Sequence, residues 1–385
     1  MSKTRKNELS KSTGLANIKR LGILPDYEID SLYRRLRINA PALAKNQVQP
    51  SSLDLRLASY IWRIPASFLP GPGRTVKDVI DKIKMIELSA NNEVLLESGA
   101  VYIALLQESL DLPKSISAIS NPKSSTGRID VLTRVICDGA SSFDSIPAGY
   151  KGPLFLEICP QMFPIIVRRG SRLSQVRFRV GDTRLNAEEH RRLQKTDLIL
   201  HDKDGSIKDA EIGEVVPLTV DLQGATPGST IAYRAKRHAG AIDVDKTDAL
   251  DVDAYWDRIA ANADKTLYLH PGDFYILASK ETIAVPNGYA AEMPTYNSKF
   301  GILINNFAGF MDPAFGVNAD LTLRSRAVLE VRCYITPFRI EHGQPIATLI
   351  YERMRGEPLT PYGAGGLGSN YQGQRLKLSK HFRAP

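Results

Sequence analysis

The chain has 385 residues, enough for two or three average domains, and its 43% hydrophobic and 24% charged residues are typical of a soluble globular protein. This composition argues against a disordered chain. Fifty Lys and Arg outnumber 42 Asp and Glu, so the formal charge of +8 suits a polyanionic ligand. No basic stripe with interleaved aromatic residues accompanies that charge, and we therefore do not expect nucleic-acid binding.

The cysteines and the N-terminus bear on the compartment. Cys137, Cys159 and Cys333 are widely spaced and form no Cys-x-x-Cys pair, which argues against structural zinc and against a disulfide framework. The first residues are polar, and no apolar run approaches the roughly 20 residues that a membrane span needs. We expect a reduced, cytoplasmic protein without a membrane segment.

The periodicity of the apolar residues divides the chain into four parts. Residues 1–46 have near-helical spacing, marked by Ile29, Leu32, Tyr33, Leu36 and Ile38, and are expected to form an N-terminal helical arm. Residues 47–182 change to period two, with short β-branched runs between Gly, Pro and Asn turns, which predicts a first β-domain. Residues 183–214 are strongly charged and are expected to be a linker. Residues 215–385 are expected to form a second β-domain with a closing tail.

Several segments of the first domain recur at one offset in the second. Leu156-Glu157-Ile158 and Leu329-Glu330-Val331 are 173 positions apart, and residues 97–103 and 270–276 are related by the same offset. Repeated matches at one offset indicate an internal duplication. The sequence therefore predicts two copies of one β-domain.

A short polar segment, Lys123-Ser124-Ser125-Thr126-Gly127-Arg128, follows Asn121-Pro122. Adjacent hydroxyls, backbone N–H groups and an arginine fork can converge on an oxyanion such as phosphate. The same residues would also suit an ordinary surface turn.

The two copies differ at the positions where chemistry is expected. The counterpart of the polar segment, residues 297–301, has no arginine. Conversely, the second copy has a tight acidic turn at Asp312-Pro313, whereas the first has a longer segment, residues 142–152, without Asp-Pro. Only the second copy ends in Tyr371-Gln372-Gly373-Gln374. Each half is therefore incomplete in a different place.

Taken together these motifs resemble the dCTP deaminase and dUTPase superfamily. The resemblance covers residues 50–57, the Ser-Ser-x-x-Arg of residues 124–128, the hairpin at Asp312, both Leu-Glu strands and the C-terminal Tyr-Gln-Gly-Gln. Lys123 departs from the family's arginine. The resemblance implies a mainly β fold of two tandem dUTPase-like distorted, jelly-roll-like β-barrels with short helices.

The resemblance also implies a site that combines both halves. Glu330 is the expected general base, with Glu157 as the alternative, and Ser124 and Arg128 are expected to orient the attacking water. The substrate-binding residues that it implies are Lys123, Ser125, Asp312, Asn305, Asn306, Ala308, Tyr371, Gln372 and Gln374. A Mg²⁺ bound through the substrate triphosphate is implied, and no zinc, because the six histidines form no zinc-deaminase motif.

The expected function is hydrolytic deamination of dCTP to dUTP and ammonia, which would feed thymidylate synthesis. The alternatives are a dUTP diphosphatase, a bifunctional enzyme that gives dUMP, and, from another class, a non-catalytic nucleotide-binding regulator. The expected ligands are dCTP and dUTP, with dTTP as a candidate regulator. A homo-oligomer or a pseudo-trimeric assembly is expected.

Overall fold

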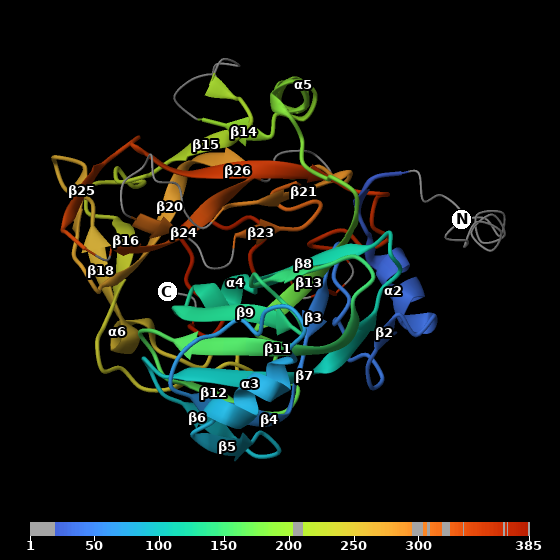
Figure 1. The fold of residues 1–385 in the computed structure, drawn as a ribbon. Helices are drawn as coiled ribbons and strands as arrows, with labels where there is room; N and C mark the ends of the chain where they lie inside the picture. The colour runs from blue at the N-terminus through green and yellow to red at the C-terminus, as the bar shows by residue number, and fades with distance from the viewer. Residues whose placement is uncertain are drawn as a thin grey trace.

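The computed structural model describes residues 20–202, 211–294, 303–305, 309–317, 324–333, 335–364, 366–367 and 369–383, with 303–305 described by backbone alone. The described strands form six sheets, and the helices are short, so the protein is mainly β as the sequence predicts (Figure 1). Every helix in these ranges is too short or too polar to span a lipid bilayer.

Three sheets are built mainly from the first half. The largest has the strand order β5-β4-β7-β11-β9, and a second has the order β1-β13-β8-β10 with β3 also paired to β13. In the third, β12 pairs with β6. The strands are β1 (Gly22–Ile23), β3 (Leu53–Leu55), β4 (Leu57–Ile64), β5 (Ile86–Ser89), β6 (Val94–Leu96), β7 (Val101–Asp111), β8 (Ser117–Pro122), β9 (Val131–Cys137), β10 (Ser145–Ile146), β11 (Lys151–Pro160), β12 (Ile165–Val167) and β13 (Ser174–Val180).

The second half repeats this topology. Its largest sheet has the order β18-β16-β20-β24-β22, and the others have the orders β15-β26-β21-β23 and β19-β25. These strands are β15 (Val216–Thr219), β16 (Thr230–Ala235), β18 (Trp256–Ala260), β19 (Thr266–Leu269), β20 (Phe274–Ile283), β21 (Tyr289–Glu292), β22 (Leu303–Asn305), β23 (Phe310–Met311), β24 (Ser325–Cys333), β25 (Phe338–Glu341) and β26 (Pro345–Arg353). The strands β7 and β20 begin 173 positions apart, the offset seen in the sequence. The repeated strand order is the structural counterpart of the predicted duplication.

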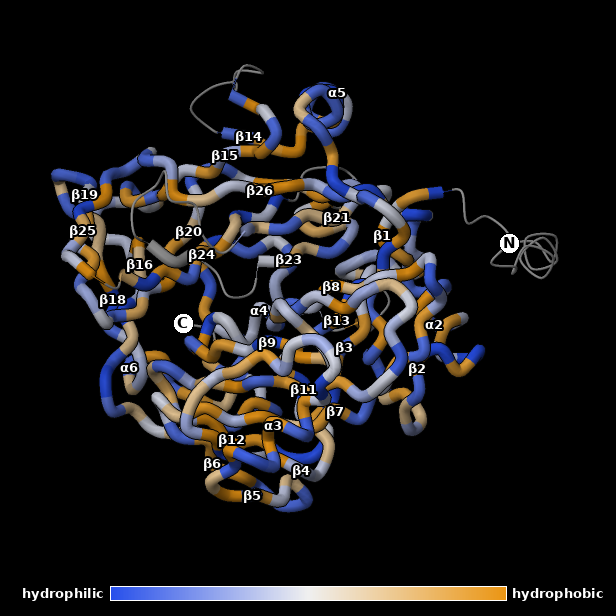
Figure 2. The backbone as a smooth tube through the Cα atoms, in the orientation of Figure 1, coloured by the Kyte–Doolittle hydropathy of each residue, from blue (hydrophilic) through white to orange (hydrophobic). Residues whose placement is uncertain are grey.

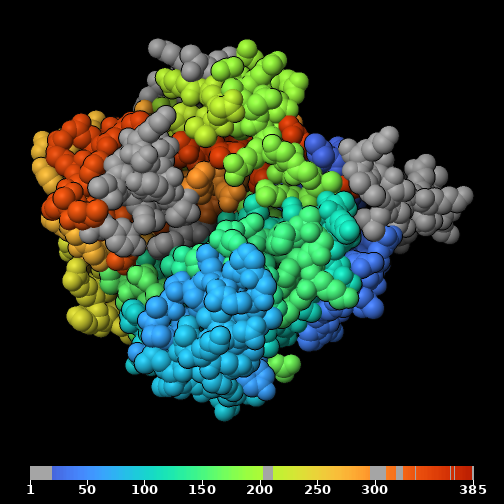
Figure 3. Space-filling view, viewed as in Figure 1, coloured from blue at the N-terminus to red at the C-terminus, as the bar shows by residue number. Residues whose placement is uncertain are grey.

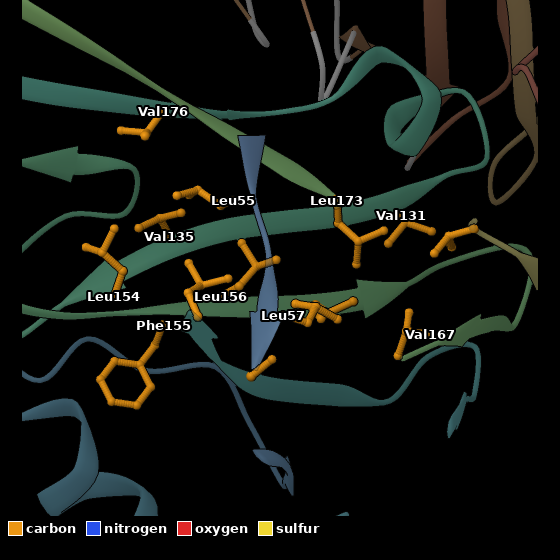
Figure 4. Packing of buried hydrophobic residues seen from close by; sticks show 14 of the residues in the cluster. Leu55, Leu57, Val131, Val135, Leu154, Phe155, Leu156, Val167, Leu173 and Val176 are labelled. Carbon is orange, nitrogen blue, oxygen red and sulfur yellow. The ribbon is translucent and has the colours of Figure 1, made fainter. Parts of the chain in front are cut away.

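The two halves share one of the main hydrophobic cores. The first core is built mainly from β-strand residues of the first half, some of which Figure 4 shows, but it also contains Trp256, Phe274, Leu378 and Phe382 of the second half. Trp256 packs edge-on against Phe163 of the first half at a ring-centroid distance of 5.5 Å. The apolar segments of both halves lie mainly along the strands (Figure 2), and the halves are in broad contact (Figure 3). The domains are therefore fused through buried apolar surface.

A pair of short parallel strands, one from each half, strengthens this junction. The strand β17 (Ile242–Asp243) belongs to the second half but pairs in parallel with β12 of the first. The helix α6 (Val252–Tyr255) follows it, and Asp251 caps its N-terminus by accepting from the Asp253 N–H. A hydrogen-bonded sheet across the junction fixes the relative position of the halves.

The N-terminal arm is shorter in helix than predicted and is part of the first domain. The helix α2 spans Asp26–Arg34 and buries Ile29 and Leu32, whereas Leu36 lies beyond its end with a φ of 56°. Ile38 belongs to the strand β2 (Ile38–Asn39), which pairs with β7. The near-helical spacing of apolar residues in the sequence therefore covers the end of a helix and a short strand.

The charged segment that we expected to be a linker packs instead into the second core. It contains the helix α5 (Ala187–Asp197), begun by a capping box between Asn186 and Glu189, and the strand β14 (Leu200–His201), which pairs with β20. Leu193 and Ile199 are buried in that core. The helix buries Leu193 together with the polar residues His190 and Gln194, so its composition is that of a linker although one face is packed, which explains the difference. Another short helix, α3 (Val76–Ile83), has a capping box between Thr75 and Asp78.

Candidate active site

The Ser-Ser-Thr-Gly segment forms a single helical turn, α4 (Ser124–Gly127), at the end of β8. The N–H groups of Thr126 and Gly127 donate to the Lys123 carbonyl at 2.8 and 3.1 Å, which closes the turn. Figure 1 shows α4 between the sheets of the two halves. The segment is therefore placed at the junction and not on an outer surface.

Gly127 permits a close approach between the halves. A Cβ atom at this position would lie 2.3 Å from Oε2 of Glu330, closer than real contacts allow. Glu330 lies on β24 and is 3% exposed, so its carboxylate is packed against the backbone of α4. Any larger residue at 127 would displace this carboxylate.

Arg128 is buried beside Glu330 and is held by the C-terminal tail. Its Nη1 and Nη2 groups donate to the Lys377 carbonyl at 3.0 Å and to Gln374 Oε1 at 2.9 Å, and its Cζ atom lies 3.9 Å from the Tyr371 ring centroid. Burial lowers the pKa of Arg128, whereas Tyr371 and Glu330 act in the opposite direction. The guanidinium remains charged at neutral pH. It supplies a fixed positive charge next to the glutamate.

The acidic turn after β23 approaches the first half. Oδ1 of Asp312 accepts a hydrogen bond of 2.6 Å from the Ser51 hydroxyl, which belongs to the Pro-Ser-Ser-Leu-Asp segment. Burial raises the pKa of Asp312 to about 6, and the hydrogen bond from Ser51 acts in the opposite direction. Ala314, in the same turn, has a φ of 72°. The carboxylate is thus available as an acceptor above about pH 6.

The Tyr-Gln-Gly-Gln tail is an ordered part of the site. Gln372 donates to the carbonyls of Ala314 and Val317 and accepts from the Gly316 N–H, so it fixes the tail to the acidic turn. Farther along, the Ser379 hydroxyl donates to the Ser125 carbonyl at 2.8 Å. The tail is therefore anchored to the second half by Gln372 and to the first half by Ser379.

These segments enclose a cavity of about 510 Å³. Among the residues predicted from the sequence, it is lined by Lys123, Ser124, Ser125, Arg128, Asp312, Glu330, Tyr371 and Gln374. The cavity thus brings residues 123–128 of the first half together with the carboxylates and the tail of the second.

Two of the other predicted site residues lie elsewhere, and the side chains of the remaining three are outside the described part of the chain. Gln372 faces the acidic turn, as described above, and does not line the cavity. Glu157 lies outside the cavity on β11, where its carboxylate accepts from Arg134 and from Ser67. Asn306 and Ala308 lie outside the described residues, and Asn305 is described by its backbone alone, at the end of β22.

One end of the cavity is rich in positive charge that the sequence did not reveal. Lys45, Arg172 and Lys380 line it in addition to Lys123. Burial lowers the pKa of Lys380, and the neighbouring Lys123 charge acts in the same direction. From the sequence, the C-terminal lysines were indistinguishable from a solvated basic tail. Their proximity to Tyr371 to Gln374 was the one signal that could have indicated a role.

Two aspartates balance part of this charge. Asp54 forms an ion pair with Lys123 and lies 3.5 Å from an NH group of Arg172. Its Oδ1 is buried and has no hydrogen-bond partner among the described residues. Asp245 also lines the cavity, and it accepts from Arg168 and Ser171. The end with these charges suits a polyanion that brings a hydrated cation.

Comparison with known families agrees with this geometry. Residues 20–182 match the family model of the 2'-deoxycytidine 5'-triphosphate deaminase (DCD) N-terminal domain, and residues 186–382 match that of its C-terminal domain. The chain belongs to the 2'-deoxycytidine 5'-triphosphate deaminase family.

Individual relatives support the same family assignment. The chain is similar to a crystal structure of 2'-deoxycytidine 5'-triphosphate deaminase from Agrobacterium tumefaciens, with 46% identity, a TM-score of 0.81, and coverage of 87% of this chain and 99% of that one. It is also 33% identical over 119 residues to a "dCTP deaminase, dUMP-forming" of Pseudarthrobacter chlorophenolicus, covering 30% of this chain and 59% of the relative. A Corynebacterium efficiens protein of the same description is 36% identical over 109 residues, covering 28% and 53%. The chain spans less than two thirds of the length of these two relatives.

Proposed function

We propose that this protein deaminates dCTP to dUTP and ammonia, with Glu330 as the general base. The main support for the proposal is the cavity, where Glu330 of the second half lies against Gly127 and beside Arg128 of the first half. Neither half alone contains this set. The family membership and the Agrobacterium relative support the same substrate.

The positively charged end of the cavity is proposed to bind the triphosphate. Lys123, Arg172 and Lys380 converge there with the hydroxyls of Ser124 and Ser125. A half-buried lysine beside other cations favours a polyanionic ligand, because the ligand restores the interaction energy that burial removes. The negative charges of a triphosphate would pair with the positive charge that Asp54 and Asp245 leave unbalanced.

The part of the cavity lined by Asp312 and Glu330 is proposed to bind the nucleoside. Asp312 would accept a hydrogen bond from the deoxyribose 3'-hydroxyl, while Phe310 and Phe315 provide apolar lining. Asn305, Asn306 and Ala308 remain proposed contacts of the base, as the family resemblance implies. The Tyr371 ring, stacked on Arg128, would close the site over the substrate.

The chemistry follows from the position of Glu330. Water adds across the N3–C4 bond of cytosine, its oxygen to C4, and Glu330 carries the water proton to N3. Glu330 then passes the hydroxyl proton to the amino group, the C4–N bond breaks, and ammonia leaves a uracil ring. Arg128 keeps Glu330 in the charged form that accepts the first proton. General acid–base catalysis of this kind contributes about 100- to 10,000-fold.

Magnesium is proposed to enter with the triphosphate. Mg²⁺ usually keeps several waters and binds through phosphates and one or two carboxylates. Asp54, whose Oδ1 is buried at the phosphate end without a hydrogen-bond partner among the described residues, would accept from one of those waters. The ion would neutralise charge on the substrate, and the deamination itself is assigned to the protein residues above.

A second candidate function is deamination followed by release of pyrophosphate, which would give dUMP. The names of the Pseudarthrobacter and Corynebacterium relatives favour it. One assay separates the alternatives: purified protein with dCTP and Mg²⁺, following ammonia, dUTP and pyrophosphate. Ammonia with dUTP supports the main proposal, and pyrophosphate with dUMP supports the bifunctional one. Hydrolysis of added dUTP without ammonia from dCTP indicates a diphosphatase, and tight dCTP binding without any product indicates a regulator.

Other properties are proposed on the same basis. Each half is proposed to be a dUTPase-like distorted barrel, since the sheet order is repeated and the family resemblance implies that fold. The cytoplasm is the proposed compartment, dTTP a candidate regulator, and a homo-oligomer or a pseudo-trimeric assembly the proposed state. Sedimentation of the purified protein with and without dTTP tests the last two.

A further inference from the structure

A buried ion pair lies next to the catalytic contact between the halves. Arg332 on β24 donates to Asp130, which follows α4 in the first half. The side chains are 9% and 0% exposed, and Arg332 also donates to the Gly272 carbonyl at 3.2 Å. The pair therefore joins the segment that carries Arg128 to the strand that carries Glu330.

The backbone spacing places four charges in one group. Glu330 and Arg332 are two residues apart on a strand, so their side chains leave the same face. Asp130 is two residues from Arg128, and both are less than 5% exposed. Along the junction the charges alternate: Arg128 beside Glu330, and Asp130 bound to Arg332.

Asp130 is itself rigidly held. It has a φ of 57°, a left-handed conformation that aspartate tolerates better than most residues. Its N–H donates to the Gly127 carbonyl at 2.8 Å, and its carbonyl accepts from the Gln161 N–H at 2.9 Å. Burial raises the pKa of its carboxyl group, and the Arg332 guanidinium opposes that rise. A fixed carboxylate of this kind gives the guanidinium only one favourable position.

We infer that the Asp130–Arg332 pair is a positioning device that sets the register of β24 against α4 and thereby holds the Glu330 carboxylate against Gly127. Buried ion pairs contribute little net stability compared with apolar residues, and their best-attested role is to specify register. A catalytic carboxylate must be held within about 0.5 Å of its working position. The inference rests on the proposed function, because it assigns the base to Glu330.

The decisive variant removes both charges together. In Asp130→Asn/Arg332→Gln neither buried charge is left without its partner, so we expect a folded protein with a melting temperature within a few degrees of wild type. We expect its kcat for dCTP to fall at least tenfold while KM changes less than threefold. A double variant with wild-type kcat would show that the pair only stabilises the fold, and would overturn the inference.

A matched pair elsewhere in the first domain provides the control. Arg56 and Glu108 form an ion pair whose side chains are 8% and 0% exposed, nearly the same as Arg332 and Asp130, and neither lines the cavity. Arg56→Gln/Glu108→Gln is expected to keep kcat within twofold of wild type. An equal loss of kcat in this control would also overturn the inference.

The pH profiles of the two single variants provide a second measurement, which a purely structural role of the Asp130–Arg332 pair would leave unchanged. Arg128, Tyr371 and Arg332 face or flank Glu330, and its cross-strand partner on β20 is the apolar Ile276. Asp130→Asn leaves the Arg332 charge uncompensated, which favours ionised Glu330 and moves the acid limb of kcat, measured at saturating dCTP, to lower pH. Arg332→Gln removes that charge and moves the limb to higher pH. Identical profiles in both variants contradict the inference.

The outcome for the wild-type protein keeps the two proposals separate. If wild type releases no ammonia from dCTP, the proposed function fails. If wild type deaminates dCTP and the double variant does so equally well, only the positioning role fails.

Discussion

The two Leu-Glu strands differ in what surrounds their glutamates. Glu157 on β11 is 1% exposed and is fully engaged, because Arg134 donates to it from Nε at 2.9 Å and Ser67 from its hydroxyl at 2.5 Å. Glu330 on β24 is equally buried but lies against Gly127 and lines the cavity. The same strand position thus carries a structural ion pair in one half and a carboxylate facing a substrate-sized space in the other.

The difference shows how duplication divides a site. In the first half, Arg134 pairs with Glu157, and its Cζ atom lies 3.6 Å from the Phe143 ring centroid. Nearby, burial raises the pKa of Asp144 to about 7. The first half meanwhile keeps α4, which the second half needs. Each half has retained the part that the other lacks.

The largest expected effect tests this division directly. Glu330→Gln should lower kcat for dCTP by about a thousandfold or more, since the general base is lost while the shape is kept. Glu157→Gln should leave kcat within threefold, although it weakens the pair with Arg134 and lowers the melting temperature. Ammonia release measures both. An inactive but folded Glu157→Gln together with an active Glu330→Gln would show that the first half carries the base.

The phosphate end gives the next largest effect. Lys380→Met should raise KM for dCTP about 10- to 100-fold, because a charge-assisted hydrogen bond to phosphate contributes roughly 1.5–3 kcal/mol. The matched control is Lys280→Met, since Lys280 pairs with Asp202 at 2.9 Å outside the cavity and should leave KM unchanged. Equal KM values for the two variants would exclude Lys380 from the triphosphate site.

Much of the architecture could be predicted because it is periodic. Alternation at Leu53 to Leu57 and the constant offset of 173 indicated β-domains and a duplication, and complementary losses indicated which segments belong together. These features are local or repeated, so a single sequence contains them. The cavity does bring residues 123–128 together with Asp312 and Glu330. Their chemical roles stay predictions.

The features that the sequence did not predict depend on contacts between segments that are far apart in the chain. Lys380 lies near Lys123 because the tail docks on the first half, where Ser379 hydrogen-bonds to Ser125 and Lys377 accepts from Arg128, and no local pattern encodes that docking. The pairing of Asp130 with Arg332 spans 202 positions. The segment around α5 resembled a linker because its helix has a charged outer face. Tertiary packing decides such cases, and sequence periodicity does not.

Asp312 leads to a prediction about pH. Because burial raises its pKa to about 6, the carboxylate becomes protonated as the pH falls through 6, well above the usual range for aspartate. A neutral carboxyl accepts hydrogen bonds less well, so KM for dCTP should rise about tenfold between pH 7.5 and pH 5. The unfolded chain binds this proton only near pH 4, so this group's contribution to stability decreases as pH rises from about 4 to 6.

Asp312→Asn is the control for that pH dependence. It should have a KM that is higher than wild type at pH 7.5 and nearly independent of pH down to 5. Initial rates measured over dCTP concentration at several pH values give both quantities. A variant that keeps the wild-type pH dependence would assign it to another group, and the 3'-hydroxyl contact would then need a different acceptor.

The smallest effect concerns the attachment of the tail to the acidic turn, a contact that the first half does not have in the described residues. Gln372→Ala removes hydrogen bonds to the carbonyls of Ala314 and Val317 and from the Gly316 N–H. Ala314 and Gly316 are buried and Val317 is half-buried, so leaving these groups without partners should lower the melting temperature. The lost bonds are neutral and do not touch the cavity, so kcat/KM should fall only about two- to threefold. The tail remains held at Ser379, which keeps Lys380 in place. A loss as large as that of Lys380→Met would mean that Gln372, and not the Ser379 contact, fixes the closed position of the tail.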